Sequence, residues 1–70
     1  MNNSYTAVIK DEGNCWIGCI QEVPGVNCQE NTYEALIDTL KITLYEALEF
    51  NKNQAISAAG DQFIEEQILV

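Results

Sequence analysis

Short runs of strand-forming residues occupy the first third of the chain, and apolar positions at a helical spacing follow. Residues 4–10 (SYTAVIK) and 15–21 (CWIGCIQ) are rich in β-branched and aromatic side chains, which favour strands. The residues between them, DEGN, supply turn chemistry, because glycine and asparagine tolerate a positive φ. This pattern predicts a β-hairpin with a four-residue loop.

The length of the loop predicts how the two strands pair. With Lys10 opposite Cys15, antiparallel pairing places one set of six side chains on a common face: Tyr5 with Ile20, Ala7 with Gly18, and Ile9 with Trp16. The two smallest residues then lie in the middle of that face, which forms a trough for a helix. The opposite face, which holds Thr6, Val8, Cys15, Ile17 and Cys19, is also fairly apolar. One main helix covers only one face, so we expect the second face to be an interface.

The segment VPGV redirects the chain after the hairpin. Pro24 fixes φ for the first central position of a turn, and Gly25 tolerates the positive φ of the second, which together predict a type II turn. We interpret both as turn residues without a chemical role. Residues 26–29 (VNCQ) can form a short third strand.

A long amphipathic helix follows. Asn31 as N-cap, with Glu34 three residues later, matches the capping-box spacing, and Thr32 is the alternative cap. One apolar stripe recurs at three- and four-residue steps: Tyr33, Leu36, Ile37, Leu40, Leu44, Ala47 and Leu48. Asparagines at 51 and 53 are weak helix formers, so we expect the helix to end or kink within 50–53, with a further short turn before Gly60.

The last eight residues, FIEEQILV (63–70), favour a strand, and their adjacent glutamates suit the edge of a sheet. The predicted order is β-β-β-α-β, an α+β fold. In this fold a small antiparallel-type sheet carries one main helix on one face. We expect residues 1–70 to form a single domain, because a chain of this length supports no more than one.

The charge excludes some classes of partner. Eleven acidic residues and three lysines give a net charge of −8, so no basic footprint is present for nucleic acid or for anionic membranes. An acidic surface favours a basic protein partner, although the same charge also keeps a small domain soluble. No stretch reaches the roughly 18 apolar residues of a membrane span, and the N-terminus lacks the features of a signal peptide. We therefore expect a cytoplasmic protein.

Candidate chemistry is sparse. The three cysteines, Cys15, Cys19 and Cys28, have no histidine partner anywhere in the chain, which disfavours both a zinc site and a catalytic thiol. Cys15 and Cys19 would lie about 13 Å apart in one strand, too far for a disulfide, so we interpret the three as free thiols acting as small hydrophobes. The carboxylates do not converge as a two-metal site requires. We expect no catalytic residue, no metal and no cofactor, and thus a protein that is not an enzyme.

The segments YTAVIK, CWIGCIQEVPGVNCQENT, EALIDTL and EALEFN, in this order, resemble the HicB-like antitoxins of toxin–antitoxin pairs. The resemblance covers essentially the whole chain. It implies a partial RNase H-like β-β-β-α-β domain that neutralises a small basic, RNA-cleaving, HicA-like toxin. Many members carry a DNA-binding domain, whereas this sequence ends at Val70, so we expect no operator binding by the chain itself. Many members also have glycine where this chain has Glu30, which affects the local turn.

The sequence therefore supports two candidate functions. The first is an antitoxin that binds a basic toxin through the second sheet face (Thr6, Val8, Ile17, Cys19) and through acids at its ends (Asp11, Glu12, Glu22). The second is a non-enzymatic domain whose sheet faces serve only self-association or scaffolding. In either case we expect a homodimer or tetramer.

Overall fold

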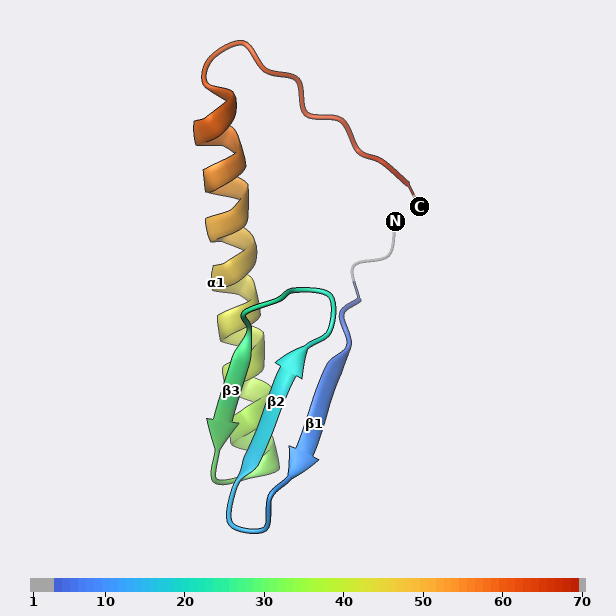
Figure 1. Ribbon diagram of the computed structural model, residues 1–70, viewed down its shortest axis with the longest axis vertical. Helices are drawn as coiled ribbons and strands as arrows, with labels where there is room; N and C mark the ends of the chain where they lie inside the picture. Colours follow the sequence, from blue (N-terminus) through green and yellow to red (C-terminus); the bar gives the residue numbers. More distant parts are fainter. Residues whose placement is uncertain (1–3, 70) are drawn as a thin grey trace.

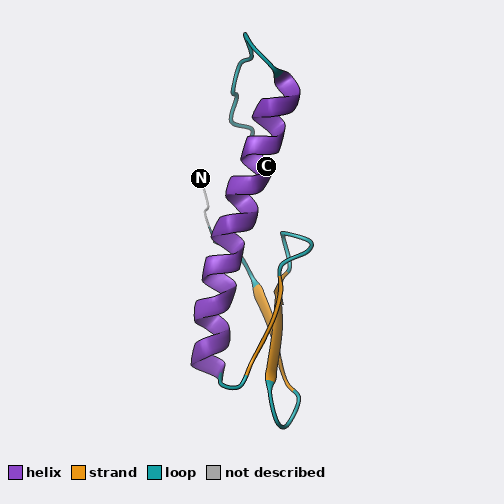
Figure 2. Cartoon of the chain, turned by 90° about the vertical axis from the view of Figure 1, so that its left-hand side faces the viewer, coloured by secondary structure: helices purple, strands orange, loops and turns teal. Residues whose placement is uncertain are grey.

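The computed structural model describes residues 4–69 as a three-stranded antiparallel sheet with one long helix against it (Figure 1). The strands are β1 (Ala7–Asp11), β2 (Trp16–Ile20) and β3 (Asn27–Glu30), in the order β1-β2-β3, and the helix is α1 (Tyr33–Ala59). Figure 2 shows that α1 lies on one side of the sheet and continues well past its end. The predicted α+β class, with the helix on one face of an antiparallel sheet, is confirmed.

The predicted pairing of β1 with β2 is wrong by two positions. The observed pairs are Ala7–Ile20, Val8–Cys19, Ile9–Gly18, Lys10–Ile17 and Asp11–Trp16. Because side chains alternate between faces with a period of two, a shift of two leaves the residues of β1 and β2 on their predicted faces, whereas Cys15 lies in the loop between them. The division into a helix-facing and an outward face is therefore confirmed, although each cross-strand partner differs.

The turn explains the shift. Asp11 belongs to β1, and its Oδ1 accepts a hydrogen bond from the Gly13 backbone N–H (2.8 Å), which caps the strand with an Asx-type turn. The loop is Glu12–Cys15, closed by the Glu12 N–H donating to the Cys15 carbonyl (2.9 Å). Gly13 has a φ of +95°. A four-residue loop was predicted, but it begins one residue later and ends one residue later than expected.

The VPGV turn is formed as predicted. The Val26 N–H donates to the Val23 carbonyl (3.4 Å), and Gly25 has a φ of +94°, as a type II turn requires. Val23 and Val26 are 7% and 1% exposed and belong to the core. Burial of a valine stabilises a fold by about 1.5–3 kcal/mol. The turn therefore contributes to the core besides redirecting the chain.

The core forms where α1 crosses β2. A Cβ added at Gly18 would lie 3.1 Å from Leu40 Cδ1 and 3.2 Å from Leu36 Cδ2, and these two leucines are 2% and 0% exposed. Because Gly18 has no side chain, the helix can pack closely against β2 at this position. The predicted role of Gly18 in the trough is therefore confirmed. Ala7, the other small residue of that trough, pairs with Ile20 at the end of the hairpin and is exposed.

Two further contacts hold the start of α1 over the sheet. The rings of Trp16 and Tyr33 meet edge to face, with centroids 5.5 Å apart. Thr39 Oγ1 donates a hydrogen bond to Glu30 Oε2 (2.8 Å), which ties β3 to the second turn of the helix. Glu30, the residue that departs from many HicB-like sequences, therefore has a structural partner.

The helix begins at the alternative cap. Thr32 is the N-cap, and its Oγ1 accepts from the Ala35 N–H (3.1 Å). The preferred assignment, Asn31 with a capping box to Glu34, is wrong because Thr32 places Ala35 at the third helical position instead. Glu34 lies in the first turn, where a negative charge is favourable.

The predicted break within 50–53 is also wrong, because α1 continues to Ala59. Asparagine costs less than about 0.7 kcal/mol in a helix relative to alanine, which is too little to end one that contains no proline or glycine. The helix stops at Gly60, which has a φ of +75° and donates its N–H to the Ile56 carbonyl (3.2 Å). The predicted role of Gly60 as terminator is confirmed.

The predicted fourth strand is not formed in residues 63–69, and Val70 lies outside the described residues. The segment leaves the end of α1 and turns back without joining the sheet (Figure 1). Sheet pairing here would require a neighbouring edge, whereas Phe63 and Ile64 line a hollow together with Ile56 of the distal helix.

Candidate protein-interaction surface

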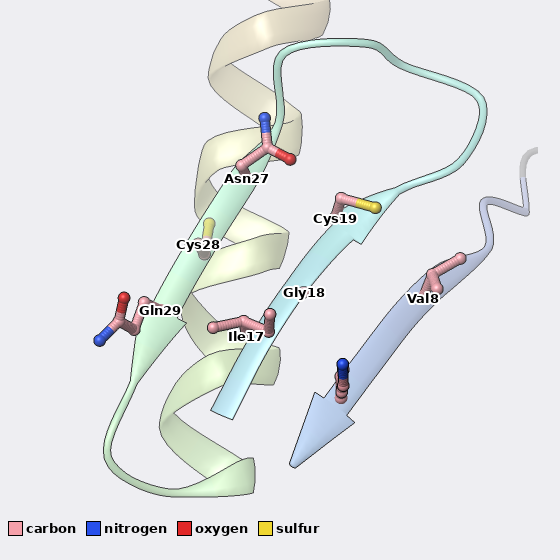
Figure 3. Close-up of a pocket in the computed structure, with 8 residues that line it drawn as sticks. Val8, Ile17, Gly18, Cys19, Asn27, Cys28 and Gln29 are labelled. Atoms are coloured by element: carbon pink, nitrogen blue, oxygen red, sulfur yellow. The ribbon is translucent and has the colours of Figure 1, made fainter. Parts of the chain in front are cut away.

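The face of the sheet that points away from α1 is uncovered. Figure 3 looks onto this face, with the helix behind the strands, and shows the side chains of Val8, Ile17, Cys19, Asn27 and Gln29 around a hollow. The hollow has a volume of about 520 Å³ and is mostly apolar. We call it the open-face hollow; it is lined by Val8, Lys10, Ile17, Gly18, Cys19, Asn27, Cys28 and Gln29.

The strand register arranges the hollow in two rows that cross all three strands. The first row is Val8, Cys19 and Asn27, and the second is Lys10, Ile17 and Gln29. The central strand therefore supplies two apolar side chains, and the outer strands supply one apolar and three polar ones. An apolar centre with a polar border is the usual arrangement of a protein–protein contact.

The exposure of these side chains fits a surface that a partner can reach. Val8 is 51% exposed, while Ile17 and Cys19 are half-buried by their neighbours on the sheet alone. Lys10 is the single charged residue of the lining, and its Nζ lies 3.3 Å from Glu12 Oε2 in an ion pair at the surface. Exposed pairs of this kind contribute little to stability and rearrange readily.

Three of the four predicted contact residues on this face, Val8, Ile17 and Cys19, are brought together in the hollow. The fourth, Thr6, lies just before β1. Its backbone is engaged on both sides, because its N–H donates to Glu22 Oε1 (2.7 Å) and its carbonyl accepts from the Gln21 N–H (2.9 Å). Thr6 thus fixes the end of the sheet beside the hollow.

The predicted acidic contacts, Asp11, Glu12 and Glu22, do not form one cluster. Asp11 and Glu12 lie at the hairpin turn, and Glu22 lies at the opposite end of β2. Each carboxylate has a partner, namely the Gly13 N–H, Lys10 and the Thr6 N–H respectively. The hydrogen bond from the Thr6 backbone lowers the pKa of the Glu22 carboxyl below its ordinary value of 4.5.

Sequence reasoning missed the polar border of the hollow, formed by Lys10, Asn27 and Gln29. The signal was present, since alternate residues of β3 must share a face with Ile17 and Cys19 once the strands pair. Asn27 and Gln29 had no assigned face without a register for β3, whereas the predicted hairpin already placed Lys10 on the same face as Cys15.

The three cysteines are free and half-buried, as the interpretation of free thiols predicts. Cys19 and Cys28 both line the open-face hollow, but the side chain of Cys28 also packs against the core, with its Sγ 3.6 Å from Thr43 Oγ1. Within residues 4–69, no group of three or more histidine, cysteine or acidic side chains is placed to hold a metal ion.

Comparison with family models, with curated proteins and with solved structures gave no match. The part of the chain that the structure describes also has no helix with the length and apolar character of a membrane span.

Proposed function

We propose that this protein is a non-catalytic binding domain of the HicB-like antitoxin type. It neutralises a small basic RNA-cleaving protein by binding it on the outer face of its sheet. The observation that carries the proposal is the open-face hollow, an apolar surface left uncovered on a strongly acidic domain. The resemblance of the strand, turn and helix segments to HicB-like sequences supplies the class of partner.

Charge and shape favour a protein partner over other ligands. The net charge of −8 attracts a basic protein over a distance of about one Debye length and repels RNA, so the same field selects the toxin and excludes its substrate. Apolar contact at Ile17 and Cys19 then provides short-range affinity, and polar groups at the border fix the orientation. On this account, the domain works in the cytoplasm and blocks the toxin without performing a reaction.

The test is a calorimetric titration of the full chain with a small basic protein that co-purifies with it from its own source cells at low salt. We expect binding that weakens with added salt. Ile17→Lys places a positive charge at the centre of the hollow and should weaken binding by about tenfold to a hundredfold, since a central apolar contact contributes roughly 1.5–3 kcal/mol.

The matched control is Ile42→Lys, which makes the same change on α1, where Ile42 is 61% exposed and does not line the hollow. Circular dichroism would verify that both variants are folded. Equal affinities for the two variants would contradict the proposed surface, and no binding by the wild type would contradict the partner class.

The second candidate function is self-association alone, as an orphan or scaffolding domain. It is favoured by the area that the chain exposes, 5790 Å², which is large for 7.8 kDa. The two functions are separated by the same titration, because a domain that only self-associates would bind no basic protein.

A further inference from the structure

The chain exposes more surface than a monomer of its size normally does. A monomeric protein of 7.8 kDa exposes about 4,400 Å² by the usual scaling, whereas this chain exposes 5790 Å². Its radius of gyration is 15.2 Å, against about 11 Å for a compact chain of 70 residues. The excess of about 1,400 Å² lies within the range that one subunit buries in a stable dimer.

The C-terminal segment, residues 63–69, is exposed throughout. Ile64, Ile68 and Leu69 are 88%, 78% and 77% exposed, and the segment belongs to no strand. Its sequence, FIEEQIL, has strand-forming residues at both ends. An extended apolar segment whose backbone is unpaired can form main-chain hydrogen bonds with the unpaired edge strand of a sheet.

The structure offers such an edge at β1. This strand pairs only with β2, so its outer edge is free within the described residues. The helix packs against β2 and β3 and leaves a groove of about 270 Å³ beside β1. The walls of this groove, which we call the β1 groove, include Tyr5 and Ala7 on one side and Ile37, Leu40 and Lys41 on the other.

The segment and the β1 groove also match in charge. In an extended chain Glu65 and Glu66 point to opposite faces, because side chains alternate. The β1 edge has one lysine on each side, with Lys41 in the groove beside α1 and Lys10 on the open face of the sheet. Added as a strand at this edge, the segment would place Ile64, Glu66 and Ile68 toward one lysine and Glu65 toward the other.

The segment of the same chain cannot lie along the β1 groove over its whole length while α1 runs unbroken. From Leu40, in the wall of the β1 groove, to Ala59 the helix advances about 28 Å. The nine residues from Gly60 to Ile68 span at most about 30 Å when fully extended. Only the last residues could therefore return to the groove, and Phe63 and Ile64 instead lie beside the distal helix.

We propose that the protein forms a dimer in which residues 63–69 of each copy add as a fourth strand to the β1 edge of the other. Backbone hydrogen bonds along β1 and the side chains of Ile64 and Ile68 in the β1 groove hold the exchanged segment. This surface shares only Lys10 with the open-face hollow, and the proposal does not depend on the toxin partner.

The test uses sedimentation equilibrium of the full chain over a wide concentration range. The wild type should be a dimer, and Ile64→Glu/Ile68→Glu should raise the dissociation constant of the dimer by a hundredfold or more. The loss of each apolar side chain should raise this dissociation constant by about tenfold or more. Both residues are highly exposed in the single chain, so their replacement leaves the fold intact.

The matched control is Ile42→Glu/Tyr45→Glu, which adds the same charge at two exposed apolar positions of α1 and should remain a dimer. A monomeric wild type, or a control that dissociates while the segment variant does not, would overturn the proposal. In a mixture of isotope-labelled and unlabelled copies, NMR should detect contacts between Ile64 or Ile68 of one copy and Ala7 of the other. Contacts confined to one copy would show that the chain folds back on itself, which would also overturn it.

Discussion

At the scale of single residues, Gly18 determines how closely the helix can approach the sheet. Leu36 and Leu40 occupy the space that a side chain at this position would need, with their methyl carbons 3.1–3.2 Å from the ideal Cβ. Those leucines are at the centre of the core, so they have little room to move. The missing side chain is therefore a packing requirement.

We expect Gly18→Val to lower the free energy of unfolding by about 1–3 kcal/mol, because overpacking displaces the two leucines and α1 with them. Urea unfolding followed by circular dichroism measures this change. Ala7→Val is the control, since Ala7 is an exposed residue of β1 and the larger side chain suits a strand. An equal effect of both substitutions would contradict the packing argument.

The contact between Glu22 and Thr6 makes part of the stability depend on pH. Because the hydrogen bond lowers the pKa of Glu22 in the folded state, its contribution is fully present above the ordinary value of 4.5. That contribution is lost as the pH falls through the lowered folded-state pKa.

We expect Glu22→Gln to be less stable than the wild type at pH 7, and the difference to disappear in acid. Thermal unfolding across the range from pH 7 to pH 3 measures it, with Glu46→Gln on the exposed side of α1 as control for the loss of one charge. A difference that stays constant with pH would mean that the carboxylate contributes nothing through this bond.

At the scale of elements, the N-terminus of α1 depends on one hydroxyl. Thr32 Oγ1 accepts from the Ala35 N–H, which would otherwise have no partner in the first turn. Thr32→Ala should lower the free energy of unfolding by about 1 kcal/mol, whereas Asn31→Ala should lower it much less. Chemical unfolding of the two variants side by side decides between the caps, and a larger loss for Asn31→Ala would contradict the assignment.

Local patterns predicted most of these elements correctly. The hairpin, the type II turn at Pro24–Gly25 and the helix all depend on residues close together in the sequence, whose preferred φ values and spacing act directly. The register shift of two arose because DEGN can close a loop at either of two positions, and the observed one is held by the hydrogen bonds from Gly13 to Asp11 and from Glu12 to Cys15.

At the scale of the whole molecule, prediction was weakest. Whether residues 63–69 form a strand depends on which edge they can reach, and that depends on the length of α1. The sequence pattern contains no such information, because the asparagines near position 52 weaken a helix without ending it. The apolar outer face of the sheet was predictable from alternation alone, while its polar border required the position of β3.

The molecule as a whole presents two separate surfaces on one small sheet. The open-face hollow spans all three strands on the side away from the helix, and the β1 groove lies on the helix side at the free edge. Because they lie on opposite sides of the sheet, a dimer built through the edge can still bind partners on its open faces.

The most direct test of the central claim is an NMR titration of the isotope-labelled full chain with a small basic protein that co-purifies with it at low salt. Changes in amide shifts should concentrate on β1, β2 and β3 around Val8, Ile17 and Gln29, and leave the outer side of α1 around Ile42 unchanged. Changes centred on α1, or none at all, would contradict the account that this domain binds its partner through the uncovered face of its sheet.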